Sequence, residues 1–155
     1  MIRPAISEDS RQIAQIWNTI IRDTTITFTP TQKNISEVAE LIARNALVWE
    51  EAGDVLGFAR FFPFRAGDGY KFTVEHTIML APQARGRGGG RALLTALCDQ
   101  ARAQGGRNLI AGCSAESPEA IAFHNACGFE TVATLSEVGF KFGRWIDLVL
   151  MQKRL

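Results

Sequence analysis

Apolar residues recur every three or four positions near the start of the chain, which is the spacing of one face of an α-helix. This pattern predicts an amphipathic helix whose buried face is formed by Ile13, Ile16, Trp17, Ile20 and Ile21. Asp9 and Gln12 stand at the spacing of a capping box, so we expect the Asp9 side chain to cap this helix. A shorter helix is predicted from Ser36, because apolar side chains follow it on one face.

Strand patterns occupy the middle of the chain. Residues 47–51 and 55–62 are rich in apolar and aromatic side chains and flank a turn-like Ala-Gly-Asp, which predicts an antiparallel hairpin. Residues 70–80 alternate well enough to predict a long third strand, which Pro82 ends. Residues 24–30 are rich in β-branched side chains and end in proline, so we expect them to leave the first helix as a loop.

The second half of the chain alternates between strands and helices. Helices are predicted at residues 90–104 and 118–127, the latter capped by Ser117 with Pro118 at its first position. Three further segments have strand patterns, at residues 108–113, 129–134 and 146–152. The order contains one β-α-β-α-β section, so part of the sheet should be parallel and the fold class is α/β with a mixed central sheet. A length of 155 residues is typical of one domain, here residues 1–155.

Composition and charge exclude several classes of protein. Apolar residues make up 46% of the chain and charged residues 21%, which is typical of a globular protein and excludes a disordered one. The net charge of +1 provides no global field for nucleic acid or an anionic membrane, so neither is expected as a partner. No segment approaches the ~18 consecutive apolar residues of a membrane span. Any anionic ligand must therefore be held by a local device.

The three cysteines are Cys98, Cys113 and Cys127. Their number is odd and none stands in a C-x-x-C pair, so neither a disulfide framework nor a zinc site is predicted. Small buried thiols are typical of a reducing compartment, which indicates a cytoplasmic protein.

A turn rich in glycine and arginine lies between the third strand and the helix at 90–104. Four glycines leave room for backbone N–H groups to point toward one spot, and the helix N-terminus adds further donors and a positive dipole end. This is the construction of a phosphate cradle. Its residues are Arg85, Gly86, Arg87, Gly88, Gly89, Gly90 and Arg91.

Four other interpretations of this turn are less consistent with its residues. A P-loop requires Gly-Lys-Ser/Thr, which is absent, and the dinucleotide pattern G-x-G-x-x-G fails because Arg91 stands at its third glycine. An RNA-binding Arg-Gly-Gly segment would be repeated and disordered. A purely structural turn would carry the entropic cost of four glycines, roughly 1 kcal/mol each, without a ligand. The pattern that remains is R-x-x-G-x-G, formed by Arg85, Gly88 and Gly90.

Residues 78–90 resemble the acetyl-CoA motif of the GNAT N-acetyltransferases. The resemblance implies the GNAT fold, with a mixed sheet of about six to seven strands and about four helices. It also implies acetyl-CoA as co-substrate, with its pyrophosphate on the amides of the glycine turn. The strand backbone that would pair with the pantetheine arm belongs to Ile78, Met79 and Leu80. A backbone N–H near Met79 or Leu80 is expected to polarise the thioester carbonyl.

Three further segments, at residues 70–76, 120–129 and 138–147, resemble the phosphinothricin and methionine sulfoximine/sulfone acetyltransferases. This resemblance implies an N-acetyltransferase that acts on the amine of a small molecule, such as an amino acid or one of those analogues. It also implies a homodimer and no metal. The aromatic segment with Phe140, Phe142 and Trp145 would then form core or a subunit contact rather than a ligand stack.

The resemblance implies catalytic roles for two residues. Glu75, three positions before Ile78, is the candidate general base, acting directly or through water; its alternative is a solvated or ion-paired strand glutamate. His124 is the candidate proton donor to the CoA sulfur, and its alternative is a half-buried packing histidine. His76 should point to the sheet face opposite Glu75 and is interpreted as structural.

The acceptor site is expected to use Phe28, Phe64, Arg65, Tyr70 and Thr73. Arg65 suits bidentate binding of an amino-acid carboxylate, although a solvated arginine is an equal interpretation. Ser117 stands where the family usually has Asn. The resemblance therefore implies that the contact of Asn to CoA is weakened or is made by the shorter serine side chain. Two other functions stay open: a protein or peptide N-acetyltransferase, which would want a more open and charged groove, and a non-catalytic CoA-binding module, which would need no base.

Overall fold

The computed structural model describes all residues from 1 to 155. Seven strands form one mixed sheet in the order β1-β2-β3-β4-β5-β7-β6. The strands are β1 (Ile2–Pro4), β2 (Ala46–Glu51), β3 (Asp54–Pro63), β4 (Thr73–Leu80), β5 (Asn108–Ser114), β6 (Glu130–Lys141) and β7 (Arg144–Arg154). The helices are α1 (Ser10–Asp23), α2 (Ile35–Ile42), α3 (Gly89–Ala103) and α4 (Pro118–Ala126). The predicted class, α/β with a mixed central sheet of six to seven strands and four helices, is confirmed.

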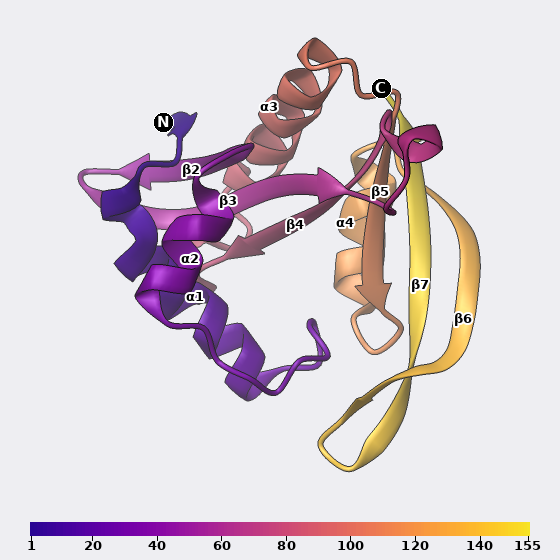
Figure 1. Ribbon diagram of the computed structural model, residues 1–155. Helices are drawn as coiled ribbons and strands as arrows, with labels where there is room; N and C mark the ends of the chain where they lie inside the picture. The colour runs from indigo at the N-terminus through magenta and orange to yellow at the C-terminus, as the bar shows by residue number, and fades with distance from the viewer.

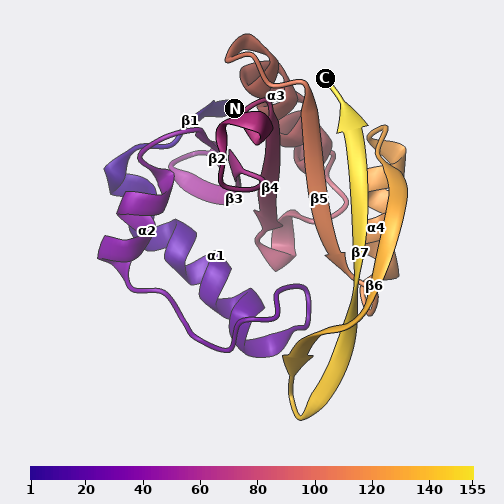
Figure 2. The ribbon, with the colours of Figure 1, turned by 45° about the vertical axis from the view of Figure 1, so that its right-hand side comes forward.

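Helices cover both faces of this sheet (Figures 1 and 2). On one face, α1 and α2 pack against β2 and β3, and the predicted apolar stripe of α1 is buried there. On the other face, Leu93, Leu94 and Leu97 of α3 are buried in a second core over β2, β3 and β4, which continues to side chains of β5 and β7. The two cores are separated by the sheet, as expected for strands whose successive side chains point to opposite faces.

Only β4 and β5 run parallel. β7 pairs antiparallel with β5, and β6 pairs antiparallel with β7 at the edge of the sheet. The predicted β-α-β-α-β section therefore makes one parallel pair, because β7 rather than β6 occupies the place beside β5.

Several predicted boundaries were wrong. The third strand begins at Thr73, because residues 68–70 form a short 3₁₀ helix in which the Tyr70 N–H donates to the carbonyl of Gly67. The α2 helix begins at Ile35 and is capped by Asn34, whose side chain accepts from the N–H of Glu37. The short edge strand β1, which ends at a proline, was not predicted.

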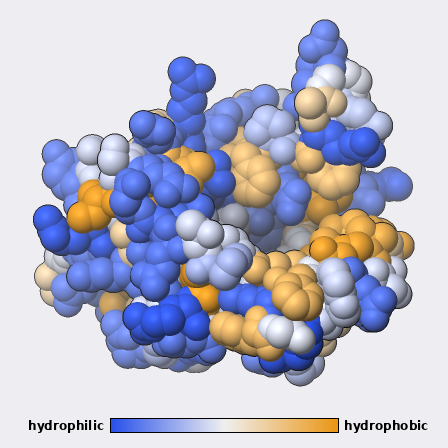
Figure 3. Space-filling model, turned by 60° about the horizontal axis from the view of Figure 1, so that its bottom comes forward, coloured by the Kyte–Doolittle hydropathy of each residue, from blue (hydrophilic) through white to orange (hydrophobic).

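The last two strands are much longer than their sequence patterns. They form a hairpin over a two-residue turn in which Phe142 and Gly143 both have positive φ, 51° and 76°. The alternation that marks a half-buried strand is obscured because large apolar side chains on the hairpin face solvent: Val132, Leu135, Val138, Phe140, Phe142 and Trp145. Figure 3 shows hydrophobic surface gathered on the side where the β6–β7 hairpin lies, beside a hollow.

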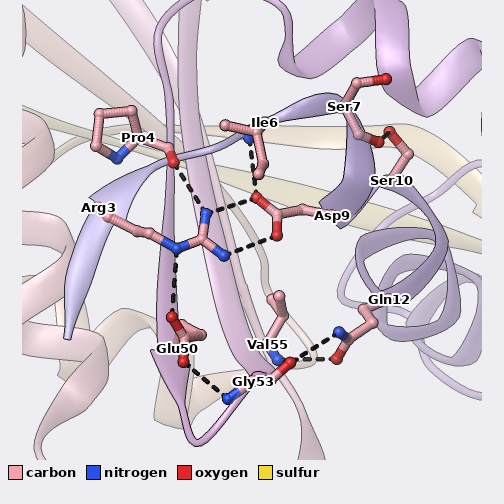
Figure 4. A network of polar contacts seen from close by, with 10 residues as sticks. All are labelled: Arg3, Pro4, Ile6, Ser7, Asp9, Ser10, Gln12, Glu50, Gly53 and Val55. Carbon is pink, nitrogen blue, oxygen red and sulfur yellow. Dashed lines mark hydrogen bonds and ion pairs between the residues drawn. The ribbon is translucent and has the colours of Figure 1, made fainter.

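The predicted cap of α1 is replaced by an ion pair. The Asp9 carboxylate accepts from two nitrogens of Arg3, each at 2.8 Å, and from the N–H of Ile6 (Figure 4). Gln12 reaches the β2–β3 turn instead, where it donates to the carbonyl of Gly53 and accepts from the N–H of Val55. Arg3 and Asp9 therefore tie strand β1 to the start of the first helix.

We predict that Asp9→Ala lowers the free energy of unfolding by about 2 kcal/mol at pH 7, because Arg3 loses its two short charged hydrogen bonds and keeps only the longer contact to a carboxylate, that of Glu50 at 3.4 Å. The Arg3 hydrogen bonds hold the pKa of Asp9 below its ordinary value. The stabilisation is therefore present above the unfolded-state pKa and is lost as pH falls through the folded-state pKa. Urea unfolding at several pH values measures this loss.

Asp23→Ala is the matched control, because Asp23 pairs with Arg22 in the open, where both side chains are more than half exposed. Its unfolding should stay within experimental error of the wild type. An Asp9 variant as stable as this control would show that the Arg3–Asp9 pair does not hold β1 in place.

Candidate active site

The parallel strands β4 and β5 separate soon after they meet. They pair only where Thr73–Glu75 lie beside Asn108–Ile110, and from His76 onward β4 has no partner on that edge (Figure 1). A cavity of about 240 Å³ lies in the opening. Strand β4 lines it from Glu75 to Met79, β5 lines it from Ala111 to Ser114, and α4 and residues 26–28 close it. The site is therefore a gap in the hydrogen-bond ladder of the sheet.

Glu75 stands at the point where the two strands part. Its side chain is half-buried, lines the cavity, and makes no hydrogen bond or ion pair within the chain. Burial raises the pKa of its carboxyl group above the ordinary value. Gly112 of β5 lies alongside, and a Cβ at Gly112 would sit 3.4 Å from Glu75 Oε1. A carboxylate without a counter-ion and with a raised pKa is suited to accept a proton.

His124 lies on the cavity wall formed by α4 and is buried. Burial lowers its pKa below the ordinary value, while the hydrogen bond to the Ala120 carbonyl acts in the opposite direction. Its Nε2 lies 3.1 Å from Nε2 of His76, whose pKa burial lowers to about 3. His76 thus contacts a candidate catalytic residue that is 48 positions away in sequence, which no local pattern could have revealed.

Ser117 lines the same cavity and is 3% exposed. The prediction that its side chain caps α4 was wrong: the helix has no side-chain cap, and the Ser117 hydroxyl has no hydrogen-bond partner. A buried hydroxyl without a partner is costly, so this one is available to a ligand.

The glycine turn joins β4 to α3. Gly86 and Gly88 adopt positive φ values of 75° and 82°, and α3 begins directly after Gly88. No backbone N–H from Gly86 to Arg91 donates to another group of the chain. Free amides at the positive end of a helix are a common arrangement for binding anions.

The other two glycines of the turn have packing roles. A Cβ at Gly89 would overlap the ring of Trp49, and one at Gly90 would press on Leu80 at 3.0 Å. These glycines therefore let α3 approach the sheet closely, and conformational freedom is needed only at Gly86 and Gly88.

The three arginines of the turn differ in their partners. Arg87 donates to Glu51 at 2.6 Å, and Arg91 donates to the carbonyl of Ala126 at 2.9 Å. Arg85 is exposed and makes no hydrogen bond or ion pair within the chain, so it is the arginine available to an anionic ligand.

Residues 26–28, in the loop after α1, close one side of the cavity. The buried Lys141 of β6 donates to the carbonyls of Thr24 and Thr27, at 2.6 and 2.8 Å. The Phe28 ring packs on Gly139, where a Cβ would overlap it. The sequence pattern predicted Phe28 at the site but gave no sign of Lys141, which lies more than 110 positions away along the chain.

The predicted acceptor residues are not all brought together. Phe28 lines the cavity, as does Phe62, whereas Phe64, Arg65, Tyr70 and Thr73 do not. Arg65 lies 5.3 Å from the ring centre of Tyr70 and lines a separate hollow of about 400 Å³. No arginine or lysine lines the cavity beside Glu75.

Three other features bear on the chemistry. All three cysteines carry free thiols, and burial raises the pKa of Cys113 to about 11. No group of three or more His, Cys, Asp or Glu side chains is arranged to hold a metal ion. None of the helices has the length and apolar character that a membrane crossing requires.

Comparisons with known proteins agree with this geometry. The acetyltransferase (GNAT) family matches residues 13–129. The L-methionine sulfoximine/L-methionine sulfone acetyltransferase of Salmonella typhimurium is 36% identical, over 99% of this chain and 94% of that protein.

Two solved structures share the fold over the whole chain. The phosphinothricin acetyltransferase of Sinorhizobium meliloti, solved with acetyl-CoA, has a TM-score of 0.94 and 35% identity, and 88% of that chain is covered. The ribosomal-protein-alanine N-acetyltransferase of Brucella melitensis has a TM-score of 0.96 and 36% identity, with 99% of that chain covered.

Proposed function

Because the chain belongs to the acetyltransferase (GNAT) family and is an N-acetyltransferase, we propose that it acetylates the amine of a small amino acid or amino-acid analogue. One observation carries the proposal: an unpaired carboxylate stands where β4 and β5 part, and β4 continues from there to a turn of free backbone amides. The first element suits an amine, and the second suits a phosphate-bearing donor.

Acetyl-CoA supplies an activated acetyl thioester, and the chain has groups that fit it. The free amides from Gly86 to Arg91, together with Arg85, would hold the pyrophosphate. The edge of β4 that has lost its strand partner offers backbone groups at Ile78, Met79 and Leu80 to the pantetheine arm. The unpartnered hydroxyl of Ser117 gives a further polar contact in the cavity.

We assign the proton transfers to two side chains. Glu75 accepts a proton from the acceptor's ammonium, directly or through water, and its burial supports this role because a raised pKa makes a carboxylate a better base. His124 donates a proton to the departing sulfur, and its place in the same cavity supports the assignment. A backbone N–H near Met79 or Leu80 polarises the carbonyl.

The acceptor class is proposed from the relatives and from the size of the cavity. The names of relatives refer to methionine sulfoximine, methionine sulfone and phosphinothricin. The cavity has apolar walls that include Ile26, Phe28 and Phe62, which suit a small side chain. Of the expected acceptor residues, Phe28 is retained, with Phe62 beside it. Phe64, Arg65, Tyr70 and Thr73 are not assigned to the acceptor, because they do not line this cavity and Arg65 lines a separate hollow.

A thioester-cleavage screen tests the acceptor class. It compares free amino acids, methionine sulfoximine and phosphinothricin with amines that lack the carboxylate and with a peptide that begins with alanine. We expect turnover with the amino-acid analogues. Turnover with the peptide alone would indicate a protein N-acetyltransferase, and CoA binding without any turnover would indicate a non-catalytic module.

We predict that Gly88→Val weakens CoA binding at least tenfold, roughly 1.4 kcal/mol, because valine is strained at the positive φ of this residue and the turn must rearrange. Calorimetric titration of the folded variant measures the affinity. Gly53→Val is the matched control, since Gly53 has a φ of +90° in the β2–β3 turn and its Cβ would meet nothing. Equal CoA affinity in the two variants would remove the cradle from the proposal.

We predict that Glu75→Gln lowers turnover about 10²–10⁴-fold, while CoA affinity is nearly unchanged, because the substitution removes the base but keeps its shape. Raising the pH toward the pKa of the amine should recover part of the rate, since solvent then supplies free amine. Steady-state kinetics measure both effects. Glu130→Gln, an exposed glutamate at the start of β6, is the control. A Glu75 variant within threefold of wild type at neutral pH would reassign Glu75 to substrate binding.

We further propose that residues 1–155 act as one acetyltransferase domain, in the cytoplasm and as a homodimer. The continuous seven-stranded sheet supports the single domain, and the free thiols suit a reducing compartment. The exposed apolar face of the β6–β7 hairpin supports self-association, since large apolar patches mark protein interfaces.

Sedimentation at micromolar concentration should show a species of twice 17.0 kDa. Trp145, which is 62% exposed, packs on Phe140 with ring centres 4.8 Å apart, so Trp145→Asp should place a charge in the interface and shift the equilibrium to monomer. Ile35→Asp, at an exposed apolar residue of α2 away from the hairpin, introduces the same charge as a control and should leave the oligomeric state unchanged. A wild type that sediments only at 17.0 kDa would contradict the dimer.

A further inference from the structure

Two buried histidines that line the cavity contact each other through their ring nitrogens. His76 extends from β4 and His124 from α4, and their Nε2 atoms are 3.1 Å apart. The other ring nitrogen of each faces a backbone carbonyl: His76 Nδ1 lies 3.0 Å from the oxygen of Ile110, and His124 Nδ1 lies 2.7 Å from the oxygen of Ala120. All four ring nitrogens are therefore engaged, and the partners determine where the protons must be.

A count of protons shows that two neutral rings do not satisfy this arrangement. A carbonyl oxygen only accepts, so each Nδ1 must carry a hydrogen. A neutral imidazole has a single N–H, which would leave both Nε2 atoms bare, with their lone pairs facing each other at 3.1 Å. One additional proton turns this repulsive contact into an N–H···N hydrogen bond. A second would place two positive charges in contact.

We propose that His76 and His124 bind one proton between their Nε2 atoms, so that the pair carries a single positive charge beside the cavity. His76 is then a positioning residue: its bare Nε2 accepts the hydrogen bond and keeps His124 protonated. The inference rests on the proposed function for the use of that proton, but the proton count depends only on the chain's own contacts.

Burial opposes the positive charge of the His76–His124 pair, and no carboxylate contacts either ring to balance it. Cys113 of β5 places its sulfur 3.5 Å from His124 Nδ1, and its raised pKa keeps it a thiol. Glu75 lines the same cavity from the opposite face of β4. Lys153 of β7 lies beyond the Phe129 ring that packs on both histidines. None of these groups reaches an Nε2 atom, so the proton count is set by the two histidines and their carbonyl partners.

One other arrangement would satisfy the rings without an added proton. The Cys113 thiol would donate to a bare His124 Nδ1, and His124 Nε2–H would donate to His76. This leaves the Ala120 carbonyl facing a lone pair at 2.7 Å, which is the shorter contact, whereas the sulfur is at 3.5 Å. The shared proton is favoured because it keeps the shorter bond.

A charged pair solves a difficulty in the proposed reaction. Burial lowers the pKa of His124, so a solitary imidazole there would be neutral and would have no proton to give. A proton held by the pair can move to the departing thiolate, which forms the S–H bond of the product. The pair is left neutral, and a proton from solvent restores it.

Nitrogen-15 NMR of the histidine rings in the ligand-free protein tests the proposal without any acetyl transfer. Both Nδ1 atoms should be protonated, and one proton should be shared by the two Nε2 atoms, with a single protonation step on titration. Two neutral rings at neutral pH, with His124 Nδ1 bare, would overturn the proposal in favour of the Cys113 arrangement.

Two substitutions separate positioning from packing. His76→Asn keeps a donor for the Ile110 carbonyl but removes the acceptor at Nε2, so the His124 titration midpoint should fall by about one pH unit or more, a tenfold loss of proton affinity. His76→Gln should restore part of the shift, because its Oε1 reaches the Nε2 position. Cys113→Ala should leave the midpoint unchanged.

In the active enzyme, the alkaline limb of the kcat–pH profile should move to lower pH in His76→Asn and return toward wild type in His76→Gln. A His124 midpoint equal in all variants would reduce His76 to a packing residue. If the wild type shows the shared proton by NMR but transfers no acetyl group, the proposed function fails while the proton-sharing proposal stands. The failures of the two proposals are therefore distinguishable.

Discussion

The separation of β4 from β5 is the constraint on which the rest of the site depends. Ladder hydrogen bonds hold the two strands together only up to Glu75, and beyond it the edge of β4 has no strand partner. Unpaired backbone groups inside a protein are costly, so such an edge persists only where a ligand or water can satisfy it. The same opening creates the cavity, and Glu75 occupies its apex because it is the last paired residue facing that side.

The elements around the gap compensate for it. β5 loses β4 as a partner but pairs with β7 along its whole length, so the sheet stays continuous. α4 follows β5 directly and brings His124 and Ser117 against the opening. α3 approaches closely enough to aim its free amides at the end of β4, which requires the two glycines that pack on Trp49 and Leu80. Each adjustment is small, and together they turn a defect of the sheet into a binding site.

Several polar groups of the site have no partner within the chain. Glu75 is half-buried without a counter-ion, Ser117 has a buried hydroxyl without a partner, and the turn before α3 holds amides without acceptors. By contrast, Asp9 and Lys141 are buried with good partners and hold elements together. The difference separates groups kept for a ligand from groups kept for the fold.

The sequence by itself determined the features that depend on neighbouring residues. Helical periodicity located the buried face of α1, the glycine pattern located the amide turn, and strand alternation placed Glu75 and His76 on opposite faces, because these depend on local φ and ψ values and on side-chain direction. Only the tertiary structure decided which distant groups meet. Asp9 pairs with Arg3 instead of capping its helix, His76 finds His124, and Lys141 holds the loop that carries Phe28. Such partners are chosen by the packing of whole elements, since a side chain's local preference is outweighed when burial offers a better-matched charge or hydrogen bond.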